Sequence, residues 1–121
     1  MSNGKMVFTS YLRGEVIILH KAGFIDFTIN FRSRNPRNVT CIDSNNIAVS
    51  VIGGDNQVVI IDLNKRSMAK TINTKSTVHG LAFNDGSLMC CARDKGLILI
   101  RIDLKDNSIT PVVKCSLLAW S

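Results

Sequence analysis

The chain has 121 residues, of which 45% are hydrophobic and 20% charged, and its formal net charge is +6. This length and composition fit one folded domain with a sizeable core and exclude an intrinsically disordered chain. The longest apolar stretches, such as Val58–Ile61 and Leu97–Ile100, are far shorter than the roughly 20 residues that cross a bilayer. The N-terminus also lacks the apolar segment of a signal peptide, so we expect a cytoplasmic protein.

The first predicted strands lie between residues 4 and 32. A short apolar run at Lys5–Thr9 is followed by a turn at Leu12–Gly14 and by a second apolar run at Glu15–Leu19. From Phe24 to Phe31, apolar and polar residues alternate strictly, which is typical of a strand with one buried and one wet face. This segment therefore predicts three consecutive strands joined by turns.

The same pattern returns twice at a period near 41 residues, over residues 38–73 and 77–113. The strands expected in these two units are Val39–Ile42, Asn46–Ser50, Val58–Leu63 and Met68–Ile72, then Val78–Phe83, Ser87–Cys91, Leu97–Leu104 and Ser108–Val113. Asp62 recurs one period later as Asp103, which predicts a turn-forming role for both. The two prolines, Pro36 and Pro111, fall near expected strand ends, where a missing N–H does least harm. The apolar segment 115–120 predicts one further strand.

Short runs of Val, Ile and Leu between Gly, Asn and Asp turns predict strands and almost no helix. A repeat of about 40 residues with four strands in each unit is typical of a β-propeller blade. The sequence therefore predicts an all-β fold, a β-propeller with three four-stranded blades per chain. In this arrangement the first blade lacks its innermost strand, and segment 115–120 is an innermost strand without a blade.

Three blades alone would leave a bare apolar sheet face at each end of the row. We therefore expect two chains to close a six-bladed homodimeric ring, each giving its segment 115–120 to the first blade of the other. The alternative is that the sequence is a fragment of a larger protein or belongs to an elongated assembly.

The blade segments resemble a known family. Val39–Ser50 with Gln57–Leu63, and Val78–Leu88 with Ser108–Val113, are similar to the NHL-like β-propeller domain at the C-terminus of invertebrate tripartite-motif proteins. The resemblance implies a domain that recognises partners, RNA among them, while ubiquitin transfer belongs to a separate RING domain. No RING-like or B-box-like spacing of cysteine and histidine is present, so the resemblance implies a binding module and not an enzyme.

Residues that could carry chemistry are few. The four cysteines form no CxxC pair and only two histidines accompany them, so we expect buried thiols in a reducing compartment rather than a zinc site: Cys41, Cys90, Cys91 and Cys115. His79 falls on a predicted innermost strand, where a lone histidine is more often structural than a general base. Gly53–Asn56 links two strands and opens no helix, which excludes a phosphate-binding loop. We expect no catalytic residue, no metal site and no cofactor.

The charge is distributed unevenly between the two ends of the blades. In an up-and-down blade, the turn between the second and third strands emerges at the same end as the connection to the next blade. This end collects seven cationic residues against two aspartates, whereas the opposite end has four cations against five aspartates. The predicted binding face consists of Tyr11, Arg13, Arg32, Arg34, Arg37, Lys75, Arg93 and Lys95. Its strongest feature is the loop 32–37, because loop arginines can contact a carboxylate or phosphate with two hydrogen bonds.

These observations favour a non-enzymatic protein-interaction or scaffold module that binds an acidic protein segment through the arginine-rich face. The alternative is RNA binding on the same face, where Tyr11 would stack on a base or anchor the ligand. A third interpretation is a solvated loop surface that binds nothing. A propeller enzyme would need a metal or an acid/base cluster in the central channel, and the sequence offers neither.

Overall fold

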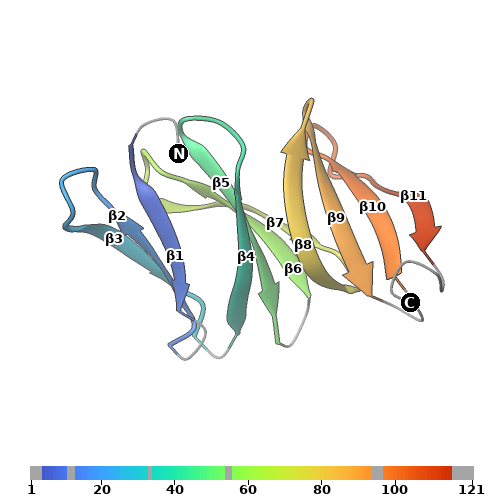
Figure 1. The fold of residues 1–121 in the computed structure, drawn as a ribbon, viewed down its shortest axis with the longest axis horizontal. Coiled ribbons are helices and arrows are strands. Elements are labelled where there is room, and N and C mark those ends of the chain that lie inside the picture. Colours follow the sequence, from blue (N-terminus) through green and yellow to red (C-terminus); the bar gives the residue numbers. More distant parts are fainter. Residues whose placement is uncertain (1–3, 11–12, 33, 54–55, 94–96, 116–121) are drawn as a thin grey trace.

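The computed structural model of the protein describes residues 4–10, 13–32, 34–53, 56–93 and 97–115. The strands of this part of the chain form three antiparallel sheets that follow one another along the long axis of the molecule (Figure 1). Their bounds are β1 Met6–Ser10, β2 Glu15–Leu19, β3 Ile25–Asn30, β4 Asn35–Cys41, β5 Asn46–Ile52, β6 Gln57–Asp62, β7 Ser67–Asn73, β8 Thr77–Asn84, β9 Ser87–Arg93, β10 Leu97–Asp103 and β11 Ile109–Cys115. Among the described residues, no helix is long and apolar enough to cross a bilayer.

Each sheet is one of the predicted units. Blade one has the order β1-β2-β3, blade two β4-β5-β6-β7, and blade three β8 to β11 in sequence order. The innermost strand of blade two is therefore β4 and that of blade three is β8, whereas blade one begins with β1, which corresponds to the second strand of the others. The predicted strand order, including the incomplete first blade, is confirmed over the described residues.

Both prolines lie near the start of a strand, as predicted, but the first of these strands begins earlier than expected. Pro36 lies inside β4, which begins at Asn35 rather than Val39, and Pro111 lies inside β11. Both stand at register shifts: β4 advances from Pro36 to Asn38 against consecutive residues of β5, and β11 skips Val112 opposite β10. The residues left out of the two ladders are Arg37 and Val112, and each proline is the paired neighbour of such a residue. Both prolines also lie on the edge strand of their sheet, where an N–H can point away from the ladder. Of the segment 115–120, Cys115 belongs to β11, and the rest lies outside the described residues.

The predicted turn role of the two aspartates is confirmed. The Oδ1 atom of Asp62 accepts the backbone N–H of Asn64 at 2.9 Å and that of Lys65 at 3.0 Å. One period later, Oδ1 of Asp103 accepts the N–H of Lys105 at 2.8 Å. Such a side-chain bond two residues ahead stabilises a turn locally. The 41-residue period therefore extends to individual hydrogen bonds.

Two hydrophobic clusters join the blades. In the first, β2 side chains such as Val16 and Ile18 pack with Val49 and Ile61 of blade two, and in the second other side chains of β5 and β6 pack with β9 and β10. Successive strand residues point to opposite faces, so the continuous apolar runs of β5 and β6 supply both clusters. Blade two is thus covered on both faces, as its sequence predicts.

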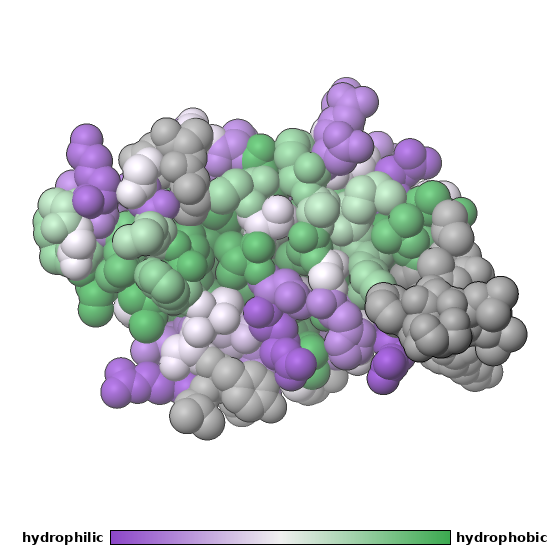
Figure 2. All heavy atoms as spheres, in the orientation of Figure 1, coloured by the Kyte–Doolittle hydropathy of each residue, from purple (hydrophilic) through white to green (hydrophobic). Residues whose placement is uncertain are grey.

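The outer face of blade one is not covered in the same way. We call the face that a blade turns toward the preceding blade its front face, and the opposite one its back face. On the front face of blade two, Ile47 and Val49 are 0% exposed, whereas Met6 and Phe8, one period earlier, are 51% and 50% exposed. Hydrophobic side chains accordingly gather over β1–β3 at the surface (Figure 2).

Candidate functional site

The loops that the sequence assigns to one end of the blades do come together. The N–H of Phe31, in the connection from blade one to blade two, donates to the carbonyl of Gly14 at 2.7 Å. The N–H of Thr74, in the next connection, donates to the carbonyl of Asn56 at 3.0 Å. In both blades the connection to the next blade therefore lies against the turn between the second and third strands.

Each connection holds a cation in the same conformation. Arg32 and Lys75 have positive φ angles of 60° and 64°, and both are exposed. The backbone N–H of Arg32 donates to the side-chain oxygen of Asn30, and that of Lys75 donates to Asn73 at 3.2 Å. An asparagine two residues earlier thus fixes each turn, and the repeat places a cation at the same turn position in both described connections.

Arg32 also lines a groove together with Arg34. This groove, of about 310 Å³, is lined by Asn30, Phe31, Arg32, Arg34 and Met68. The guanidinium of Arg34 donates to the side-chain oxygen of Gln57 and lies 5.7 Å from the centroid of the Phe31 ring. These two contacts, one polar and one cation–π, hold Arg34 in place. The groove therefore combines two guanidinium groups with an apolar floor.

The other described residues of the predicted binding face do not line this groove. Arg13 is exposed and lies 3.8 Å from Glu15, a long ion pair that contributes little in water. Arg37 is exposed but lies on β4 and not in a loop, because the strand begins at Asn35, before the Pro36 bulge. Arg93 is exposed at the end of β9. Tyr11 and Lys95 lie outside the described residues.

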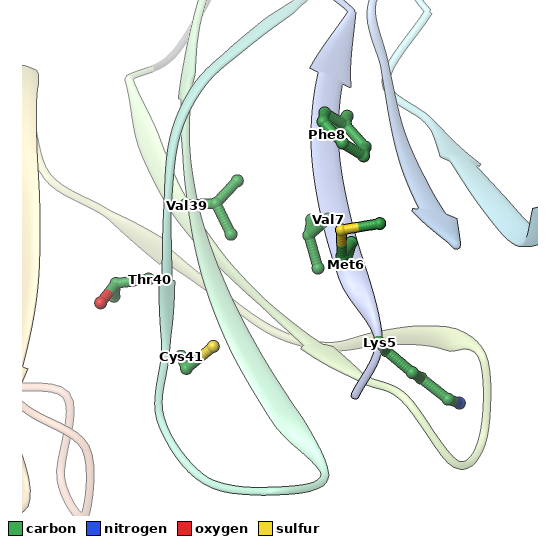
Figure 3. Close-up of a pocket in the computed structure, with 7 residues that line it drawn as sticks. All are labelled: Lys5, Met6, Val7, Phe8, Val39, Thr40 and Cys41. Carbon is green, nitrogen blue, oxygen red and sulfur yellow. The ribbon is translucent and has the colours of Figure 1, made fainter. Parts of the chain in front are cut away.

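A second groove, which the sequence did not indicate, lies between β1 and β4 (Figure 3). It has a volume of about 380 Å³ and is lined by Lys5, Met6, Val7, Phe8, Val39, Thr40 and Cys41. Val7 and Val39 point into the gap between the two strands, whereas Met6 and Phe8 point away from it (Figure 3). The groove borders the inner edge of β1, where the other two blades each have one more strand.

Lys5, at one end of this groove, belongs to an ion cluster that the sequence also did not predict. Its Nζ atom lies 2.9 Å from Oδ2 of Asp26, and Nη2 of Arg66 lies 3.1 Å from Oδ1 of the same carboxylate. The hydrogen bond from Lys5 and the charges of Lys5 and Arg66 lower the pKa of Asp26 below its ordinary value. Because Arg66 follows β6, the cluster joins blade one to blade two. In the sequence, Asp26 reads only as a residue of the wet face of a strand.

The expected burial of the cysteines is only partly correct. Cys90 is 0% exposed, and burial raises the pKa of its thiol to about 12. Cys91 is half-buried, but Cys41, at the end of β4, is exposed. His79 is also exposed. Over the described residues, no group of three or more His, Cys, Asp or Glu side chains is placed to hold a metal ion.

No protein-family model matches the sequence, and no curated protein matches it. Solved structures match the fold. The β-propeller domain of Myceliophteria thermophila Cps50 (Swd1) matches with a TM-score of 0.70 and 13% identity, over 93% of this chain and 36% of that one. The WD40 domain of Neurospora crassa Pan2 matches with a TM-score of 0.64 and 18% identity, over 80% of this chain and 29% of that one.

The three sheets are blades of a β-propeller. At these identities the likeness concerns the fold alone, and the fold is the one that the 41-residue repeat predicts. The chain spans about a third of the length of each of the two propellers.

Proposed function

We propose that this propeller segment is a non-enzymatic interaction module whose basic end binds an acidic segment of a protein. The basic end consists of Arg13, Arg32, Arg34, Arg37, Lys75 and Arg93, with the predicted Tyr11 and Lys95. The groove that contains both Arg32 and Arg34 carries the proposal. A planar guanidinium binds a carboxylate with two parallel hydrogen bonds, and the exposed part of Met68 in the groove suits the methylene groups of a Glu side chain. The resemblance of the blades to NHL-like propellers remains a prediction from the sequence pattern.

The same charges would also attract RNA, but the groove itself has no exposed aromatic ring among its described residues, which favours a protein ligand there. Recognition of single-stranded RNA relies on bases stacked against exposed rings or guanidinium planes. Of the described residues that line the basic groove, the aromatic one is Phe31, which is 2% exposed and already lies beneath Arg34. A stacked base would therefore find no open ring in this groove, and RNA binding becomes an outcome of the test.

The test compares two double variants that remove equal charge. A fluorescent peptide of ten residues, rich in Glu, is titrated with the wild-type chain and with Arg32→Ala/Arg34→Ala. Because both arginines contact the same carboxylates, we expect at least a tenfold loss of affinity, about 1.4 kcal/mol. The control, Lys65→Ala/Lys105→Ala, removes two cations from the opposite end and should change the affinity less than twofold. Equal losses in the two variants would show that only net charge matters and would overturn the proposal.

A second titration uses a single-stranded uridine oligonucleotide of the same net charge. The affinity of RNA falls linearly with log salt concentration, at a slope set by the number of phosphates contacted. If RNA binds more tightly than the peptide, and Arg34→Ala/Arg37→Ala flattens that slope, the basic end is an RNA site. Tighter binding of the peptide at every salt concentration supports the protein ligand.

We also propose that two copies close a ring of six blades. On the front face of blade one, Met6 and Phe8 are about half exposed. The residues one and two periods later, on the front faces of blades two and three, are buried. The back face of blade three carries Met89, Cys91 and Leu99, all half-buried. The chain already contains two back-to-front contacts of this kind, so the two open faces of a pair of chains can form two more.

Sedimentation of two matched variants tests the ring. Phe8→Glu places a charge on the front face of blade one and should convert a dimer into a monomer of 13.3 kDa. Phe24, before β3, is 58% exposed and stacks on His20, so Phe24→Glu should leave the dimer intact. A wild-type chain that sediments as a monomer at every concentration would overturn the ring.

A further inference from the structure

We propose that the inner edge of β1 is a strand-acceptor site, and that residues 116–121 of a second copy fill it as the innermost strand of blade one. The inference rests on the proposed ring and deepens the expectation that the C-terminal segment is exchanged, because it identifies the strand edge and the groove that receive it. Four observations support it: the edge, the groove, the period and the reach of the segment.

The edge is the first observation. In blade two β5 pairs with β4 on its inner side, and in blade three β9 pairs with β8. Among the described strands, β1 stands at the end of the sheet order of blade one and pairs with β2 alone. Alternate residues of an edge strand direct their N–H and C=O groups away from the sheet, which is a template for another strand.

The groove is the second observation. The innermost strands of blades two and three, β4 and β8, contact each other. On its other side, β4 contacts β1, and the groove of about 380 Å³ lies between them. Its walls carry Val7 and Val39, which point into the gap, so the space is apolar (Figure 3). The groove lies where the repeat places an innermost strand.

The period identifies the occupant. One period of 41 residues carries the first half of β8, Thr77–Gly80, onto Leu118–Ser121. The connections between blades take only residues 31–34 and 74–76, so 116–117 suffice for the corresponding one. In blade three, Val78 pairs with Ala92 and Gly80 with Cys91. Carried onto blade one, the register of blade three pairs Ala119 with Ser10, and that of blade two, where Pro36 pairs with Val51, pairs Leu118 with Ser10. Both registers place the segment 118–121 along the inner edge of β1.

The reach of the segment indicates that it comes from a second copy. Strand β11 is the outermost strand of blade three, and blade two stands between it and β1 (Figure 1). Packed sheets lie about 10 Å apart and neighbouring strands about 4.8 Å, so the path inside one chain covers about 20 Å between sheets and about 14 Å across blade three. Six residues extend to at most about 20 Å. They cannot cross that distance and also pair with β1.

In the ring, by contrast, blade three of one copy stands next to blade one of the other. The step from the partner copy's β11 to the inner edge of β1 is then the same step that residues 74–76 make between β7 and β8. The residues Leu117, Leu118, Ala119 and Trp120 are apolar, which suits the apolar walls that Val7 and Val39 give the groove.

Hydrogen exchange of the full chain, compared with a chain that ends at Cys115, tests the proposal, with sedimentation of both. We expect the amides of β1 to exchange at least tenfold more slowly in the full chain, and those of β3, the outer edge of the same sheet, to exchange equally in both.

The outcomes separate this proposal from the ring on which it rests. If both chains are dimers and β1 exchanges at the same rate in each, strand exchange is wrong and the ring stands. If the full chain is a monomer, the ring fails, and the exchanged strand with it. A synthetic peptide of residues 109–121 that slows exchange of β1 in the shortened chain would support the acceptor site directly.

Discussion

Two residues one period apart offer a direct comparison of a covered and an uncovered blade face. Ile47 on β5 is 0% exposed, and Met6 on β1 is 51% exposed. Replacing Ile47 with Ala removes three carbons from the core, worth about 2.4 kcal/mol of transfer free energy at about 0.8 per carbon. A partly collapsed cavity adds to this, so we expect Ile47→Ala to lower the free energy of unfolding by about 3–4 kcal/mol.

Met6→Ala also removes three heavy atoms, but half of that side chain is already in water and no closed cavity forms. We expect a loss of about 1 kcal/mol for the isolated chain. Urea unfolding of both variants in dilute protein measures the two values, with unchanged m-values as the check that only stability has changed. If both substitutions cost the same, the two front faces are equally covered and the reasoning from the repeat is refuted.

Three further predictions follow from single contacts. Asp26→Asn should destabilise the fold at pH 7, because the lowered pKa of Asp26 provides stability that is fully present above the ordinary value of 3.8. The difference from the wild type should shrink as the pH falls below 3.8, and urea midpoints measured over this range check it. Gly14→Ala should lower both the stability and the affinity for the acidic peptide, because the added Cβ would lie 2.6 Å from the carbonyl oxygen of Arg32 and 2.8 Å from that of Arg34. The control Gly86→Ala, at positive φ in open space, should cost only about 1 kcal/mol of stability and should leave the affinity unchanged. Iodoacetamide should label Cys41 in the native protein and Cys90 only after unfolding, since Cys90 is buried with a pKa of about 12; equal labelling rates, measured by mass, would contradict this.

The repeat made most of the fold predictable. Strand order depends on where apolar runs and turns alternate. The period is visible in the sequence itself, because the pair Asp62-Leu63 returns 41 residues later as Asp103-Leu104. The unbroken apolar run Val58–Ile61, which is β6 in the structure, likewise indicated a sheet covered on both faces. These features are local or periodic, and a single sequence records them.

The exact strand limits and the side-chain contacts were harder to predict from the sequence. A bulge at Pro36 depends on how β4 meets β5, so the pattern placed Arg37 in a loop that the structure makes a strand. The cluster around Asp26 depends on a turn 40 residues away, and the groove with Arg32 and Arg34 depends on a ring and an amide from other segments. The sequence identified the cations of this end but not which of them share a groove.

A crystal structure of the purified 121-residue chain is the most direct test of the whole account, because coverage of the front face of blade one underlies both the ring and the exchanged strand. We predict two chains in a closed ring of six sheets, with blade three of each against Met6 and Phe8 of the other. A dimer in which the first blades of the two chains pack front to front would contradict this prediction. So would a chain whose Met6 and Phe8 remain exposed to solvent.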